Sequence, residues 1–313
     1  MVIISLDQIK QILPKLDLIA QIQQGFQAYS EGRAIVPPVG EMILERGEVH
    51  IKYGFVKNDD YYVIKVASGF YHNPEQGLPS GNGLMLLFSQ KTGEPAAILL
   101  DEGYLTNIRT AVAGAIVARY MAPASVDKIG IAGAGTQGRL QLRYLKNVVN
   151  CKHVLVWGLN QEEVDNYKLE MENEGFSIET TLDASEILRN CNLVVTATPS
   201  KRPILNVRDL KKGTHITAMG SDTPEKQELD SGILRKADIV VADSIEQCLT
   251  RGEIARAISA GDLKKERVIE LGNVISGSAK GRTSDQQITV ADLTGVAVQD
   301  ISIASAVFRA NIR

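Results

Sequence analysis

Three closely spaced glycines are the first place in the chain where chemistry is expected. Gly133, Gly135 and Gly138 form the pattern GxGxxG between the apolar run KIGIA and a stretch with helical spacing. In a strand–turn–helix unit they would provide a tight turn, close approach of the backbone to a pyrophosphate, and close packing of helix against strand. Because a second apolar run, HVLVWG, follows, the pattern predicts a dinucleotide-binding site. A glycine-rich turn that binds nothing is the alternative.

The residues after the second apolar run bear on which nicotinamide dinucleotide binds. NAD sites usually place an Asp or Glu there, about 20 residues after the glycines, to hold the ribose hydroxyls. This chain has Gly158, Leu159 and Asn160 instead, and Arg139 at the start of the preceding helix could meet a 2′-phosphate. The pattern therefore favours NADP. NAD stays open, because no Arg or Lys ends the strand either.

Two lysines lie in runs that otherwise resemble buried strands. Lys65 is in YYVIKVA, where its neighbours are apolar, and burying an unpaired ammonium group is costly. We therefore expect Lys65 to face a polar cleft or to pair with an acid. Lys52, in VHIKYGF, is a similar case, for which a solvated strand face is the alternative.

A guanidinium and a carboxylate complete the candidate reactive groups. Arg109 follows Thr106 at the start of a predicted helix. If Thr106 is the N-cap, the guanidinium and the free backbone amides converge, which suits a bidentate carboxylate. An ion pair with Asp101 or Glu102 is the alternative. Asp222 follows the run HITAMG, at the carboxyl end of a predicted parallel strand, where open α/β sheets bind ligands; a cap or turn residue is the alternative there.

The elements that must position the lysines occupy the first part of the chain. A Ser-x-x-Gln capping pair and helical spacing predict two helices, at residues 5–14 and 18–29. Runs of alternating pattern fill residues 48–100, with a Lys-Thr-Gly-Glu turn at 91–94. We expect an antiparallel sheet there, followed by a helix at 106–121.

The second half of the chain alternates short β-branched runs with helix-like stretches such as 162–174 and 184–190. Strands buried on both faces are typical of a parallel sheet with helical crossovers. We therefore predict the α/β class: a doubly wound Rossmann sheet in residues 122–295 and an α+β domain in residues 1–121, to which a C-terminal helix at 296–313 returns.

Composition limits the partners. The chain has 313 residues, of which 44% are hydrophobic and 23% charged, with a formal net charge of -3. This charge offers no basic field for nucleic acid or an anionic membrane. The start, MVIISLDQIK, lacks the pattern of a secretion signal, and no run suits a membrane span, so we expect a cytoplasmic protein. The three cysteines and four histidines show no disulfide or metal-ligand spacing; we expect buried thiols and no metal site.

Five segments resemble the ornithine cyclodeaminase and mu-crystallin family over nearly the whole chain. They are YLTNIRTAVAGAIVARYMAP, GAGTQG, LVVTATPS followed by Pro-Ile-Leu at 203–205, MGSDTPEKQELD and ITVADLTGVAVQD. The resemblance implies a homodimer built through the N-terminal substrate-binding domain, a nucleotide domain inserted after it, and chemistry in the cleft between them. The family includes ornithine and lysine cyclodeaminases, ketimine and pyrroline-2-carboxylate reductases, alanine dehydrogenases and a thyroid-hormone-binding protein.

The resemblance also assigns roles to individual residues. It implies that Arg109 binds the substrate carboxylate, that Lys65 faces the substrate, with Lys52 beside it, and that Asp222 is the catalytic carboxylate near the reacting nitrogen. Glu41, in VGEM, marks where relatives place an acidic residue near the substrate. The residues expected to bind the cofactor lie in the glycine loop and after the following strands: Gly133, Gly135, Thr136, Gln137, Gly138, Arg139, Asn160, Thr196, Thr198, Met219 and Ser221.

Departures from the cyclodeaminase pattern favour one branch of the family. Cyclodeaminases have an Asn and a His after the strand lysine and Leu-Met-Pro after the acidic residue, whereas this chain has Val66-Ala67-Ser68 and Met42-Ile43. We therefore expect NAD(P)H-dependent reduction of a cyclic ketimine carboxylate such as 1-pyrroline-2-carboxylate, to give a cyclic amino acid such as proline. Cyclodeamination with bound NAD, an alanine dehydrogenase-like reaction, and a crystallin-like binding protein are the alternatives.

Overall fold

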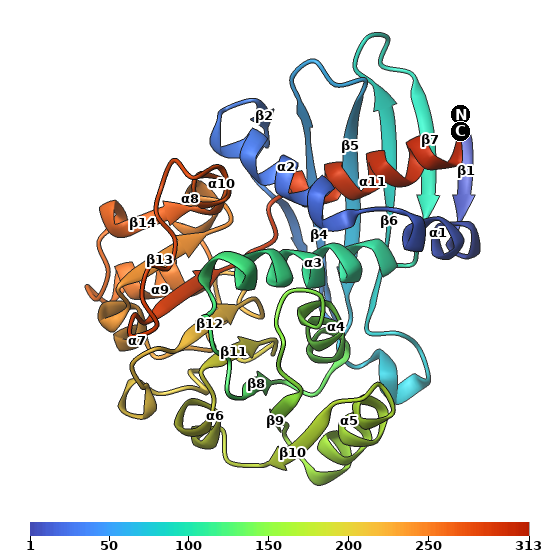
Figure 1. The fold of residues 1–313 in the computed structure, drawn as a ribbon. Coiled ribbons are helices and arrows are strands. Elements are labelled where there is room, and N and C mark those ends of the chain that lie inside the picture. The colour runs from blue at the N-terminus through green and yellow to red at the C-terminus, as the bar shows by residue number, and fades with distance from the viewer. Residues whose placement is uncertain (313) are drawn as a thin grey trace. The chain divides into compact units, whose positions relative to one another are not determined.

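Figure 1 shows the fold as a computed structural model, which describes residues 1–312. The chain forms two compact units: unit 1 comprises residues 1–110 and those from 296 onward, and unit 2 comprises residues 111–295. The first boundary falls inside helix α3 (Tyr104–Met121), whereas the sequence pattern places it at the end of that helix. Arg313, the last residue of the expected C-terminal helix, lies outside the described residues.

The sheet of unit 1 is mostly antiparallel, as the alternating runs predict. Its strand order is β1-β7-β6-β5-β4-β2, and β3 pairs with β4. β1 pairs with β7 in parallel, and the sequence pattern did not reveal it. The strands are β1 (Val2–Ser5), β2 (Ala34–Ile35), β3 (Gly40–Ile43), β4 (Glu48–Val56), β5 (Tyr61–Gly69), β6 (Gly81–Ser89) and β7 (Pro95–Leu100).

One face of this sheet forms the core of unit 1. Val63, Met85 and Leu99 on that face are at most 1% exposed. Helix α11 covers it, and Phe308 packs edge-on against Tyr61 with ring centroids 5.1 Å apart. The expected helices are present: α1 (Leu6–Ile12), with the Ser5 and Gln8 capping box, α2 (Leu18–Ser30) and α11 (Val298–Asn311), together with the short 3-10 segments Leu13–Lys15 and Asn73–Gln76.

Unit 2 has the predicted doubly wound parallel sheet, in the order β10-β9-β8-β11-β12-β15-β13-β14. Ile187 of α6, Ile233 of α7 and Ile254 of α9 belong to one core cluster with alternate strand residues. The strands are β8 (Ile129–Ala132), β9 (His153–Trp157), β10 (Ser177–Thr181), β11 (Leu193–Thr196), β12 (His215–Ala218), β13 (Ile239–Ala242), β14 (Val268–Glu270) and β15 (Thr289–Asp292). The α-helices that follow α3 in this unit are α4 (Thr136–Leu145), α5 (Gln161–Asn173), α6 (Ser185–Asn190), α7 (Ser231–Lys236), α8 (Ile245–Cys248), α9 (Gly252–Ser259) and α10 (Leu271–Ser276).

Candidate functional site

The turn between β8 and α4 has the geometry of a dinucleotide site. Gly133 has a φ of +119°, and an added Cβ would lie 2.7 Å from the Ala197 carbonyl oxygen. At Gly138 a Cβ would lie 2.1 Å from the Gly133 oxygen, so glycine lets α4 approach β8. At Gly135 a Cβ would meet no atom within 4 Å, which leaves the N-terminus of α4 open to a pyrophosphate. The residues present, with Thr136 and Gln137 in the first turn, fit NAD or NADP.

A carboxylate lies at the end of β9, although not in the expected position. Asn160 caps helix α5 and accepts a hydrogen bond from the Glu163 amide at 3.0 Å. The Glu163 side chain turns back, so that its Oε2 accepts from the Leu159 amide at 3.2 Å. NADP was predicted on the assumption that this strand end has no acid. That assumption was wrong, because the acid comes from the first turn of the next helix.

Arg139 is engaged within the protein. Its Nε lies 2.6 Å from Glu170 Oε2, its guanidinium lies 5.1 Å from the centroid of the Tyr167 ring, and it also donates to the Ala134 carbonyl. It therefore ties α4 to α5. The expectation that Arg139 is available to a 2′-phosphate is not what the structure shows.

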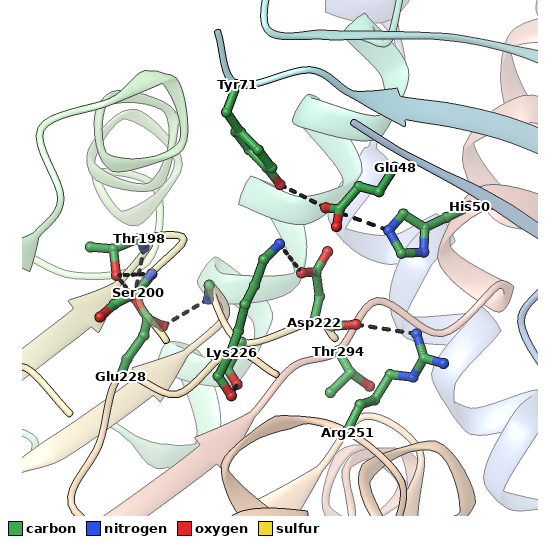
Figure 2. Close-up of polar contacts among 12 residues, drawn as sticks. Glu48, His50, Tyr71, Thr198, Ser200, Asp222, Lys226, Glu228, Arg251 and Thr294 are labelled. Carbon is green, nitrogen blue, oxygen red and sulfur yellow. Dashed lines mark hydrogen bonds and ion pairs between the residues drawn. The ribbon is translucent and has the colours of Figure 1, made fainter. Parts of the chain in front are cut away.

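A buried carboxylate organises the loops after β11 and β12 (Figure 2). Glu228, at 0% exposure, accepts from the Thr196 hydroxyl at 2.6 Å, the Thr198 hydroxyl at 2.8 Å and the Gly220 amide at 2.9 Å. Burial raises the pKa of Glu228. Burial and the nearby Glu228 raise the pKa of Glu253 to about 8. The two threonine hydroxyls are therefore used by Glu228, and a cofactor role for these threonines stays a prediction.

Asp222 lies on the loop that this network holds. Lys226 Nζ donates to Asp222 Oδ1 at 2.8 Å, and Arg251 Nη1 donates to the Asp222 carbonyl at 3.2 Å. The Ser221 hydroxyl donates to the Lys226 carbonyl at 2.7 Å. Met219, two residues before Ser221, is buried. The Asp222 side chain is 38% exposed while that of Lys226 is 7% exposed. An ammonium group at this distance stabilises the ionised carboxylate.

In unit 1 the structure brings together the three cations that sequence analysis selected. Lys52 and Lys65 are directly opposite each other on β4 and β5. They are 6% and 2% exposed, and Arg109 is 5% exposed. Asp300, at the start of α11, lies 3.1 Å from Lys65 Nζ and 3.0 Å from Arg109 Nε. Arg109 also donates to Gln299 at 3.1 Å, so its partner is neither Asp101 nor Glu102.

The electrostatics of this cluster suit an added anion. Burial and the neighbouring Arg109 lower the pKa of Lys65 to about 7, even though Asp300 acts in the opposite direction. Burial raises the pKa of Asp101 to about 6. A substrate carboxylate beside Lys65 would stabilise the charged form of this lysine.

The proposed N-cap of the α3 helix was wrong. The helix begins at Tyr104, so Thr106 lies inside its first turn. Asp101 Oδ2 accepts from the Leu105 amide at 2.8 Å instead. Glu102 and Gly103 have φ values of +53° and +79°, and this turn moves the helix start ahead of the predicted position.

Glu41 is next to a histidine to which sequence analysis gave no role. Glu41 on β3 is opposite His50 on β4, and its Oε1 lies 3.3 Å from His50 Nδ1. Glu48 Oε1 lies 3.6 Å from His50 Nε2 and accepts from the Tyr71 hydroxyl at 2.8 Å (Figure 2). Alternation along β4 places Glu48, His50 and Lys52 on one face of the sheet.

Six residues described above were not predicted from the sequence: Glu48, His50, Glu163, Lys226, Glu228 and Asp300. Glu228 and Lys226 stand in the motif MGSDTPEKQELD, and Asp300 ends ITVADLTGVAVQD, so the family segments contained a signal for these three. Among residues 1–312, no group of three or more His, Cys, Asp or Glu side chains could hold a metal ion. The cysteines are free and buried. No described helix is both long and apolar enough for a membrane span.

Comparison with known proteins identifies the class to which this fold and site belong. Residues 2–312 match the ornithine cyclodeaminase/mu-crystallin family, and the chain belongs to that family.

One relative and two solved structures show which enzymes this chain is similar to. An uncharacterized cyclodeaminase of Sinorhizobium fredii is 40% identical, with 99% of this chain and 95% of the relative covered. An archaeal alanine dehydrogenase dimer with bound NAD is 33% identical, with a TM-score of 0.91 over 99% of this chain and 95% of the other. The Δ1-pyrroline-2-carboxylate reductase of Thermococcus litoralis, in complex with NADH and L-proline, is 27% identical, with a TM-score of 0.93 over 100% and 98%. These similarities support an enzyme of the nicotinamide-dependent oxidoreductase class.

Proposed function

We propose that this protein reduces a cyclic ketimine carboxylate, such as 1-pyrroline-2-carboxylate, to the cyclic amino acid. The observation that carries the proposal is the burial of three basic side chains, Lys52, Lys65 and Arg109, at 6%, 2% and 5% exposure in one unit. A guanidinium and an ammonium held in this way suit the α-carboxylate of an imino acid. The dehydrogenase and reductase relatives support the same class of reaction.

The residues of the two units have separate tasks in this proposal. Arg109, Lys65 and Lys52 of unit 1 fix the carboxylate and so the orientation of the ring. Asp222 of unit 2, kept ionised by Lys226, is the counterion of the protonated imine. The cofactor, held at the glycine loop, supplies the hydride when it is bound.

Protons and charge balance without a proton-donating carboxyl. The imine binds in its protonated form, so the carbon of the C=N bond is electrophilic and the nitrogen already carries its hydrogen. Addition of one hydride to that carbon gives the neutral secondary amine, which takes a proton from water. Asp222 therefore stays ionised throughout and acts by electrostatic stabilisation.

The test is an assay of the purified protein with 1-pyrroline-2-carboxylate, in which oxidation of NADH and NADPH is followed in parallel and ornithine with NAD is the comparison. Loss of reduced cofactor with the imine, and no proline from ornithine, would support the proposal. Formation of proline and ammonia from ornithine without net change in the cofactor would overturn it in favour of cyclodeamination.

We also propose that NADH is preferred over NADPH. The Glu163 carboxylate at the end of β9 can accept hydrogen bonds from ribose hydroxyls and would repel a 2′-phosphate. The similar solved enzymes described above hold NAD or NADH.

Glu163→Gln should therefore lower the ratio of kcat/KM for NADH to that for NADPH by about tenfold, since one unfavourable charge pair is removed. Steady-state kinetics with both cofactors would measure this ratio. Glu162→Gln, in the same helical turn, is the control and should leave the ratio unchanged. An unchanged ratio in Glu163→Gln would remove Glu163 from cofactor selection.

We further propose that unit 1 binds the substrate and forms a homodimer, and that unit 2 binds the cofactor. The sheet face opposite α11 carries partly exposed apolar side chains across its strands, and Ile3, Tyr53 and Leu100 are 56%, 37% and 44% exposed. Several exposed apolar side chains on one face of a sheet are typical of a protein interface. The archaeal relative described above is a dimer.

A charge at the centre of this face should separate the dimer. Ile64→Glu on β5 should shift the mass measured by light scattering from that of two chains to that of one, because each copy would bury an unpaired carboxylate. Leu169→Glu, on a side chain that is 67% exposed on α5, is the matched control and should leave the mass unchanged. A dimer that persists in Ile64→Glu would place the interface elsewhere.

A further inference from the structure

The sheet face that holds the cation cluster continues into an acidic group, which the proposed reaction does not use. Lys52, His50 and Glu48 follow one another at every second residue of β4, so they share that face. Glu41 joins from β3, opposite His50. Tyr71 joins from the segment after β5. We call Glu41, Glu48, His50 and Tyr71 the distal group.

The contacts within the distal group give it a defined shape. The Tyr71 hydroxyl donates to Glu48 Oε1 at 2.8 Å, and the same oxygen lies 3.6 Å from His50 Nε2. The other ring nitrogen of His50 lies 3.3 Å from Glu41 Oε1. In Figure 2 the Glu48 carboxylate lies between the tyrosine hydroxyl and the imidazole. The imidazole therefore faces one carboxylate on each side.

His50 provides an independent sign that this group meets a ligand. The residue is 8% exposed, yet neither ring nitrogen makes a hydrogen bond within the described residues. Buried polar side chains normally have hydrogen-bond partners, and an exception calls for a specific explanation. A ligand hydroxyl or ammonium group that donates to a ring nitrogen would supply the missing partner.

The strands beside the distal group carry small residues on this face of the sheet. Ala67 is opposite His50, and Gly69 is opposite Glu48. On the next strand Gly83 is opposite Ala67, and Gly81 is opposite Gly69. The same face of the sheet thus changes from large buried side chains to Ala and Gly just where the distal group begins.

We propose that the distal group is a second substrate subsite, which recognises a hydrogen-bond donor, either a hydroxyl or an ammonium group, on the substrate. Lys52 and His50 are two residues apart on one strand, so the donor sits about 7 Å from the carboxylate-binding position. The substrate class is then an α-imino or α-amino acid whose ring or chain bears such a donor. This inference rests on the proposed function for the location of the carboxylate.

The acidic side chains of the distal group disfavour a second carboxylate on the substrate at this position. Two carboxylates flank the imidazole of His50, so a ligand carboxylate at this position would lie beside two acidic side chains. Like charges disfavour each other at such distances. Dicarboxylates should therefore bind worse than unsubstituted imino acids.

Binding of isosteric ligands to the NADH complex tests the subsite by calorimetry. L-Ornithine and L-norleucine differ by an ammonium in place of a terminal methyl group, and the wild type should bind ornithine at least tenfold more tightly. In Glu48→Gln this preference should fall to threefold or less, because a charge-assisted hydrogen bond is lost. Tyr71→Phe, which removes only the hydroxyl that orients Glu48, should lower it by about threefold. Glu94→Gln, in the exposed β6–β7 turn, is the control and should keep the preference.

A parallel measurement identifies which donor is used and separates this inference from the proposed function. Reduction of 1-pyrroline-2-carboxylate is compared with that of its 4-hydroxy derivative in each variant, and a higher kcat/KM for the hydroxy compound that Glu48→Gln abolishes would assign the donor as a hydroxyl. Equal binding of ornithine and norleucine with equal turnover of the two imines would overturn the subsite but leave the proposed function intact. Selective binding of ornithine with no turnover of either imine would support the subsite and overturn the proposed reaction.

Discussion

Asp222→Asn is expected to lower kcat for imine reduction by about a thousandfold, the cost of removing one aligned electrostatic group from a reacting centre. Asn keeps the shape of the side chain and removes only its charge. In the wild type, Lys226 Nζ lies 2.8 Å from the Asp222 carboxylate. The charge of Asp222 is therefore already in place before the protonated imine arrives, and it need not be created during the reaction.

The affinity for NADH should stay within about twofold of the wild type in this variant, because the glycine loop follows β8 whereas Asp222 lies on the loop after β12. Stopped-flow turnover and a fluorescence titration with NADH would measure the two quantities separately. Glu225→Gln is the matched control from the same loop. It pairs with Lys201 at 2.5 Å and is 73% exposed, so we expect wild-type turnover. A turnover of Asp222→Asn within tenfold of the wild type would remove Asp222 from the mechanism.

The glycine loop shows which parts of the fold the sequence could predict. A β-branched run, three glycines and a helix are consecutive, so their geometry follows from local sterics. The structure has the expected turn, with a φ of +119° at Gly133. The short strands at the sheet edges are harder to predict, because few of their own residues indicate a strand. β1 (Val2–Ser5) lies directly before a capped helix, and its pairing with β7 comes from residues far along the chain.

The site residues divide in the same way. The pairing of Lys65 with an acid could be predicted, because an ammonium group in an apolar strand is costly to bury without a partner. Its partner Asp300 could not, since an acid at the start of an amphipathic helix is typical of solvent exposure, and only the fold brings it within 3.1 Å of Lys65. Glu228 stands in a polar segment and gave no sign that it would be 0% exposed. Glu163 resembled an ordinary acid of a first helical turn, and its return to Leu159 depends on the side-chain conformation.

Lys65→Met is expected to raise the dissociation constant of a ring carboxylate by about a hundredfold at pH 6, through the loss of a buried charge-assisted contact. Pyrrole-2-carboxylate is a suitable probe, because its nitrogen does not titrate near neutral pH. The wild type should also lose affinity for this probe as the pH rises above 7. Its Lys65 has a pKa of about 7, so the ammonium form that attracts the anion is present below that pH and disappears above it.

The two dissociation constants should therefore converge at high pH. In the wild type the constant should rise with pH above 7, whereas in Lys65→Met it should be nearly independent of pH, because Arg109 keeps its charge throughout. Calorimetric titrations of the NADH complex between pH 6 and pH 9 would show this. Lys57→Met, at an exposed lysine of unit 1 that donates to the Gly32 carbonyl at 2.9 Å, should follow the wild-type curve. A wild-type constant that does not change over this range would mean that Lys65 stays charged, and the pH dependence of the enzyme would then have to come from the substrate imine.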